Sequence, residues 1–168
     1  MIGILGAVWG LIGVFLLLGS ALYRLTLISV DAFSHDFFWY HWTALALNVL
    51  FMAYSEGYRG FQQGFSPRVA ARARYLKDHP RVHHALLGPL FCMGYFHATG
   101  RRKVTAIALT VGIAILIMMV RHLPQPWRGI VDVGVVIGLA WGIVSLFIFT
   151  LRAFVSEEFP YSPEVPEG

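Results

Sequence analysis

Charged residues are scarce in this sequence, and their scarcity decides the class of protein. Only 13% of the 168 residues are charged, whereas 57% are hydrophobic. An ordinary soluble domain carries about a quarter charged residues. There is too little polar surface here to cover a water-soluble globule, so most of the chain must be solvated by lipid. The net charge of +4 does not indicate nucleic-acid binding, because the basic residues gather in one region, which suits anionic lipid headgroups.

Several chemical motifs are also missing. A single cysteine, Cys92, excludes an intrachain disulfide and a cysteine-based zinc site. The sequence contains no G-x-S-x-G, P-loop or C-x-x-C motif. It has no acidic pair in the middle of an apolar run, of the kind that proton-coupled transporters often use. The sequence therefore shows no recognisable catalytic set.

Long apolar runs are what the sequence has instead. Four of them lie within the roughly 17–25 residues that a helix needs to cross the hydrocarbon core. They cover residues 2–23, 37–55, 104–120 and 130–151. The first run has no basic segment before it and no A-x-A-like cleavage site after it, so we expect it to be retained as a span. We predict an all-α integral membrane protein with four transmembrane helices.

A fifth apolar run, His84–Thr99, is shorter and contains Gly88, Pro89 and Gly94. Nine Lys and Arg residues lie within residues 59–103, against three in residues 24–36 and 121–128 together. Cytoplasmic loops carry an excess of Lys and Arg, and a fifth span would separate the basic residues 68–81 from the basic residues 101–103. We therefore predict a re-entrant or interfacial elbow in a bacterial inner membrane, with both termini cytoplasmic. A fifth short span is the alternative.

The remaining segments complete the predicted organisation. Residues 1–152 form the transmembrane domain, within which residues 56–103 are a basic cytoplasmic segment that carries the elbow at 84–99. Ser66 as N-cap, Pro67 at the first helical position and Pro80 as a stop predict a short basic helix. It either lies on the inner leaflet or is solvated and serves only to set the orientation of the chain. The glycines and aromatic residues of Gly57–Phe65 indicate a tight turn before it. The acidic, proline-rich tail, residues 153–168, is expected to be extended and poorly ordered.

Glycines recur at four-residue spacing in the first and last spans. Small residues at this spacing let two helix backbones approach closely in lipid. They can join spans of one chain, or they can contact another membrane subunit or a second copy. The residues concerned are Gly6, Gly10, Gly134, Gly138 and Gly142.

Polar residues near the spans predict specific partners. Asn48 lies in mid-span, where an unpaired amide is costly, so it should face another helix. Asp132 is four residues from Arg128 and can form an ion pair with it on the helix surface. Glu56 and Arg59, three residues apart, are predicted to form a similar pair.

Histidines are the most suggestive polar residues. His79, His83 and His84 form the sequence H-P-R-V-H-H, which resembles the second histidine box of membrane fatty-acid desaturases and hydroxylases. In that family several boxes at the cytoplasmic face hold two irons. The only other close pair in this sequence, His35 and His41, is predicted at the opposite face and cannot converge with the first set.

His97 lies beyond the elbow on the same side as this box. His79, His83, His84 and His97 are thus the candidate metal ligands, for zinc, copper or iron. Interfacial histidines with a structural or lipid-contact role are the alternative.

The elbow also offers a candidate ligand pocket. Aromatic side chains can form its apolar floor and arginines its cationic rim, for a lipid or a quinone. The residues are Phe91, Tyr95, Phe96, Arg101 and Arg102. The basic residues of 68–81 and 101–103 are expected to contact anionic lipid headgroups.

Three functions are compatible with these features. Abundant helix-packing devices favour an accessory, assembly or scaffold subunit of a larger membrane complex. A histidine-ligated enzyme acting on a lipid, quinone or alkyl substrate is the first alternative. Lipid or quinone binding without catalysis is the second.

Overall fold

The described part of the chain is helical throughout. The computed structural model describes residues 2–156 and 158–165, and it contains no strand within them. Three helices are long and apolar enough to cross a membrane: α1 (Ile2–Ala32), α6 (Gly100–Val120) and α7 (Trp127–Val155). The predicted helical membrane class is thus confirmed at this level. The second predicted span, residues 37–55, contains no single α-helix long enough to cross a membrane within the described residues, since α2 (Trp39–Met52) has 14 residues.

The second rod of the bundle is built from three consecutive elements. α2 is followed without a break by the π-helix η1 (Ala53–Phe65) and by α3 (Ser66–Asp78). The tight turn predicted for Gly57–Phe65 is therefore wrong. Hydrogen bonds in a π-helix reach one residue further back than in an α-helix, and the amide of Ser66 accordingly bonds to the carbonyl of Phe61. Helical hydrogen bonding thus continues through the glycines up to Pro67.

The basic helix predicted at 66–80 exists, and it ends at Asp78. It does not stand apart from the bundle, because Val69, Ala73 and Leu76 are fully buried. α3 packs against both α1 and α7, and the hydroxyls of Ser66 and Ser145 share a buried hydrogen bond of 2.6 Å between α3 and α7. Apolar burial on this scale anchors the helix to its neighbours.

α7 is the central helix of the bundle. It packs against α1, α2, η1 and α3, whereas α6 makes few contacts with other elements. The main core gathers apolar residues of α1, α3, α5 and α7. Its buried members are Leu11, Val14, Leu18, Val69, Ala73, Leu76, Phe91, Cys92, Leu139 and Leu146.

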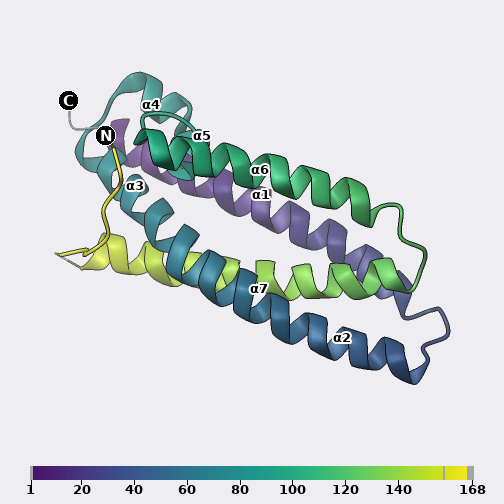
Figure 1. The fold of residues 1–168 in the computed structure, drawn as a ribbon. Coiled ribbons are helices and arrows are strands. Elements are labelled where there is room, and N and C mark those ends of the chain that lie inside the picture. The colour runs from purple at the N-terminus through teal and green to yellow at the C-terminus, as the bar shows by residue number, and fades with distance from the viewer. Residues whose placement is uncertain (1, 157, 166–168) are drawn as a thin grey trace.

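The two ends of the bundle hold different segments (Figure 1). The start of α1, the end of α7 and the helices α4 (Val82–Leu86) and α5 (Gly88–Met93) gather at one end. The connections from α1 to α2 and from α6 to α7 lie at the other. His41, near the second end, is buried and its Nδ1 accepts a hydrogen bond from the amide of Phe38. It is thus far from the other histidine cluster, as the sequence predicted.

Candidate functional site

The segment that carries the candidate residues, Val82–Met93, is packed backbone to backbone against the first half of α1. A Cβ atom added to Gly10 would lie 3.0 Å from the carbonyl oxygen of Gly88, and one added to Gly6 would lie 2.7 Å from the Cβ of Ala85. Gly13 meets the ring of Pro89 in the same way. The glycines of α1 therefore make room for α4 and α5 within the same chain.

The glycines of α7 also make room for other elements of the same chain. A Cβ atom at Gly134 would meet the amide group of Asn48 at 2.2 Å, and one at Gly138 would meet the carboxyl oxygen of Glu56 at 2.8 Å. Gly142 contacts the ring of Phe61. These glycines thus pack against α2 and η1, and contact of either glycine face with a second chain stays a prediction.

The histidines gather only in part. The ring of His84 lies 4.3 Å from that of His83 and 4.5 Å from that of His97, measured between ring centroids. The ring of His79 stacks on Tyr75 at 4.6 Å. Among residues 2–156 and 158–165, no three His, Cys, Asp or Glu side chains form a group that could hold a metal ion. Binding of zinc, copper or iron at the histidines stays a prediction.

His84 is nonetheless unusual. Its side chain is buried, and its Nδ1 has no hydrogen-bond partner within the described residues. Burial lowers the pKa of His84 to about 4, and the charges of His83, His97, Arg81 and Arg72 act in the same direction. The folded chain therefore holds this imidazole in its neutral form.

This burial predicts a loss of stability in mild acid. A histidine whose pKa is lower in the folded state stabilises the fold above the pKa of the unfolded chain, about 6.5, and loses that contribution as the pH falls toward 4. Thermal unfolding in detergent should therefore show a loss of about 1–2 kcal/mol between pH 7 and pH 5.

His84→Gln should reduce this pH dependence, whereas His122→Gln, at an exposed position on the opposite end, serves as the matched control. Part of the dependence should survive in His84→Gln, because burial also lowers the pKa of His97. An unchanged pH dependence in His84→Gln would contradict the prediction.

The predicted lipid or quinone residues are largely engaged within the chain. Phe91 is fully buried, and the Tyr95 hydroxyl is hydrogen-bonded to that of Thr110. Arg102 is 8% exposed, whereas Arg101 is exposed.

Two shallow pockets lie elsewhere on the described residues. One of about 160 Å³ is lined by Tyr75, His79 and Tyr161 among others. The other, of about 380 Å³, is an apolar groove beside Trp9 and Leu86. A lipid or quinone site at the predicted residues stays a prediction.

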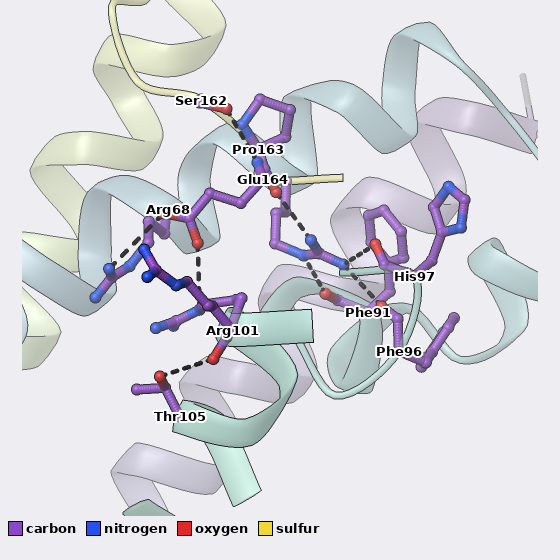
Figure 2. A network of polar contacts seen from close by, with 11 residues as sticks. Arg68, Phe91, Phe96, His97, Arg101, Thr105, Ser162, Pro163 and Glu164 are labelled. Atoms are coloured by element: carbon purple, nitrogen blue, oxygen red, sulfur yellow. Dashed lines mark hydrogen bonds and ion pairs between the residues drawn. The ribbon is translucent and has the colours of Figure 1, made fainter. Parts of the chain in front are cut away.

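Arg72 is the residue that organises this end of the molecule, and sequence reasoning missed its role. Its side chain is 1% exposed. Its Nε donates to the carbonyl of Phe91 at 2.6 Å, and Nη1 donates to the carbonyl of Pro163 at 2.8 Å. Nη2 donates to the carbonyls of Phe96 at 2.9 Å and His97 at 3.1 Å (Figure 2).

The guanidinium also lies 4.3 Å above the ring of Phe91. One side chain thus ties α3 to α5, to the turn before α6 and to the C-terminal tail.

The tail is docked on the chain rather than free. The amide of Thr99 donates to the carbonyl of Glu164 at 3.1 Å, and the amide of Glu164 donates to the Ser162 hydroxyl at 3.1 Å. The carboxylate of Glu164 lies 3.9 Å from Arg68 and 3.7 Å from Arg102. The predicted disorder of the tail is therefore wrong for residues 162–164, while residues 166–168 lie outside the described part of the chain.

Of the three long apolar helices, α6 has the smallest buried share. Every residue from Ile107 to Met119 is exposed, and only 6% of its most apolar window is buried, compared with 39% for α1 and 33% for α7. A Cβ atom added to Gly112 would meet nothing within 4 Å. Ala108 lies four residues before Gly112, so a small-residue face is open on this helix.

Comparison with protein-family models, curated proteins and solved structures finds no match to this chain. Its function is therefore argued from the arrangement of its own residues.

Proposed function

We propose that the protein is an accessory, assembly or scaffold subunit of a larger membrane complex, and that α6 contacts a transmembrane helix of another subunit. One observation carries the proposal: α6 leaves residues 107–119 without burial, although α1 and α7 are each about one-third buried. In lipid, close packing between helices is a main source of association, and small residues permit it. The open Ala108–Gly112 face supplies that surface, whereas the glycines of α7 pack within the chain.

The proposed topology has four spans: α1, α2 extended by η1, α6 and α7. Residues 84–99 return to the side from which they came as a re-entrant or interfacial elbow. The close contacts of Gly10 with Gly88 and of Gly13 with Pro89 support this elbow, because they place it beside apolar turns of α1. The start of α1 and the end of α7 at one end of the bundle also fit an even number of crossings (Figure 1).

The excess of Lys and Arg in residues 59–103 favours the cytoplasmic face of a bacterial inner membrane for that end. Reporter fusions after Lys77 and after Gly168 should both be active in the cytoplasm. A C-terminal reporter that is active only outside would contradict the topology.

A photo-crosslinking side chain at Ile113 tests the proposed use of α6. Ile113 on α6 and Val144 on α7 are 54% and 59% exposed, so the two positions are matched in exposure. We expect crosslinking at Ile113 to give a discrete adduct with another membrane protein in intact membranes, and crosslinking at Val144 to give lipid adducts alone.

Gly112→Leu should reduce the Ile113 adduct roughly tenfold, because overpacking of an interface costs on the order of 1–3 kcal/mol. It should leave the isolated chain as stable as before, since nothing lies within 4 Å. Gly19→Leu, at an equally open glycine on α1, is the matched control. An adduct of twice the chain mass would assign the face to a second copy, and lipid adducts alone at Ile113 would contradict any protein partner there.

A further inference from the structure

The tail carboxylate of Glu164 lies in a cluster with an excess of positive charge. Arg68 and Arg102 form ion pairs with this single carboxylate, and Arg72 donates to the carbonyl of the neighbouring Pro163 (Figure 2). The hydrogen bonds of Arg72 go to neutral carbonyls of residues 91, 96, 97 and 163. Because Arg72 is 1% exposed and Arg102 is 8% exposed, two of these cations are largely removed from water. Such charges are costly unless they have anionic or hydrogen-bonding partners.

Glu164 fills this site incompletely. Its distances of 3.9 Å to Arg68 and 3.7 Å to Arg102 exceed the roughly 2.7–2.9 Å of a charge-assisted hydrogen bond. The Nε of Arg68 is buried and has no hydrogen-bond partner within the described residues. The cluster therefore retains a donor that the carboxylate does not use, and an anion with more oxygen atoms can satisfy it.

The backbone at this site is held in an unusual conformation. Glu164 has a φ of 48° and His97 a φ of 47°, and they are the only non-glycine residues in the left-handed region among the described residues. Such conformations persist where surrounding contacts hold them, and they concentrate at binding and switching sites. Both residues contribute carbonyls to the network, one to the amide of Thr99 and one to Arg72. Release of the tail from Glu164 onward would relieve one of them.

The cluster also lies at the start of an apolar helix that is long enough to cross a membrane. Arg102 is in the first turn of α6, where an apolar helix begins. Arg and Lys at such boundaries attract anionic headgroups. The carboxylate of Glu164 is 36% exposed and the side chain of Arg68 is 33% exposed, so a ligand can approach from that side.

We propose that Arg68 and Arg102, beside the buried Arg72, form a binding site for the phosphate of an anionic phospholipid, and that Glu164 occupies this site as an internal carboxylate that the lipid displaces. This site is independent of the partner face on α6, so either proposal can fail alone. Arginine binds phosphate oxygens with parallel hydrogen bonds that a carboxylate at ion-pair distance does not use.

Lipid retention by the full-length chain in neutral detergent tests the site. Native mass spectrometry would compare phosphatidylglycerol, which is anionic, with phosphatidylcholine, which is zwitterionic, at equal concentration. We expect selective retention of phosphatidylglycerol, roughly fivefold stronger in Glu164→Gln, since loss of one competing ion pair is worth about that factor. Glu158→Gln removes the same charge from an exposed position of the same tail and should leave retention unchanged.

Variants of the arginines complete the test. Arg102→Gln should retain roughly fivefold less phosphatidylglycerol, whereas Lys103→Gln, which removes one positive charge at the exposed neighbouring position, should behave as the unmodified chain. Equal effects of Glu164→Gln and Glu158→Gln would overturn the proposal, because they would show a response to net charge alone. Undiminished retention by Arg102→Gln would also overturn it.

Hydrogen exchange measures displacement of the tail directly. Phosphatidylglycerol should accelerate exchange at the amide of Thr99, whose hydrogen bond to the carbonyl of Glu164 depends on the docked tail. Exchange at Phe91, whose amide bonds to Leu87 within the elbow, should stay unchanged. Bound phosphatidylglycerol without acceleration at Thr99 would place the lipid elsewhere. Acceleration by inorganic phosphate at matched ionic strength, but not by phosphatidylglycerol, would assign the site to soluble phosphate instead of lipid.

Discussion

Replacement of Gly88 by leucine is expected to destabilise the protein by about 3 kcal/mol, because the new side chain has no space. A Cβ atom at Gly88 would lie 2.9 Å from the carbonyl oxygen of Gly6 and 3.0 Å from the Cα of Gly10. These are backbone atoms of α1, and they cannot rotate away as the end of a side chain can. The substitution must therefore push α5 away from α1 and disturb the core around Cys92.

The midpoint of thermal unfolding in detergent measures this loss. Gly88→Ala should give a smaller decrease than Gly88→Leu, since it adds one methyl group to the same contact. Gly19→Leu, on α1, is the control, because a Cβ at Gly19 meets nothing within 4 Å. Equal midpoints for Gly88→Leu and Gly19→Leu would show that α1 and α5 do not pack closely.

The membrane character of this chain could be predicted from composition, but helix boundaries could not. The first run was predicted to end at residue 23, whereas α1 continues through Arg24 and Asp31 to Ala32. Hydropathy marks where a helix can contact lipid, and polar residues beyond that limit do not end the helical hydrogen bonding. α7 likewise begins before residue 130 and ends at Val155.

The contacts of polar residues near the spans were predicted correctly in two cases. In one the partner is close in sequence, and in the other any backbone carbonyl of a neighbouring helix can accept the hydrogen bond. Asn48 donates to the carbonyl of Ile130 at 2.8 Å, and Asp132 lies 3.8 Å from Arg128. Glu56 is different, because its carboxyl contacts Gly138 and no ion pair joins it to Arg59 within the described residues. The π-helix explains this, since residues three apart share a face on an α-helix but not on the wider turn of η1.

Glycine spacing predicted close approach but not the partner. Gly6 lies against α4 and Gly138 against η1, although the same spacing is equally compatible with contact between α1 and α7. A glycine in the sequence indicates only that a neighbouring group approaches the backbone closely at that position. The identity of the neighbour depends on the path of the segment from 53 to 99, which contains a long π-helix that the glycines of Gly57–Phe65 did not reveal.

The sequence contained a sign of the role of Arg72 that was misread. Arg72 is one of the basic residues of 68–81 for which contact with anionic lipid headgroups is predicted. It is three residues after Val69 and four before Leu76, so it also falls on their apolar stripe. A lone arginine on a buried stripe indicates an internal network, whereas its acceptors could not be predicted. They are backbone carbonyls of the short helix α5, of the turn before α6 and of the tail, and they carry no residue-type signal.

Substitution of Arg72 by lysine should therefore destabilise the protein by about 3 kcal/mol although the charge is kept. A lysine has three donors on one nitrogen, whereas the guanidinium of Arg72 reaches four carbonyls from three nitrogens. Each buried carbonyl left without a donor costs about 1–3 kcal/mol, and the ammonium group is more strongly hydrated than the guanidinium that it replaces. Loss of the flat group also removes its contact with the ring of Phe91.

Two measurements separate this network from a simple requirement for positive charge. Thermal unfolding in detergent should show the loss for Arg72→Lys and almost none for Arg101→Lys, where the side chain is exposed. Hydrogen exchange at the amide of Glu164 should rise in Arg72→Lys, because the carbonyl of Pro163 loses the donor that holds the neighbouring residue in place. If Arg72→Lys unfolds at the midpoint of the unmodified chain, positive charge alone is sufficient at this position. In that case the tail must be held by Arg68, Arg102 and the amide of Thr99 without help from the guanidinium.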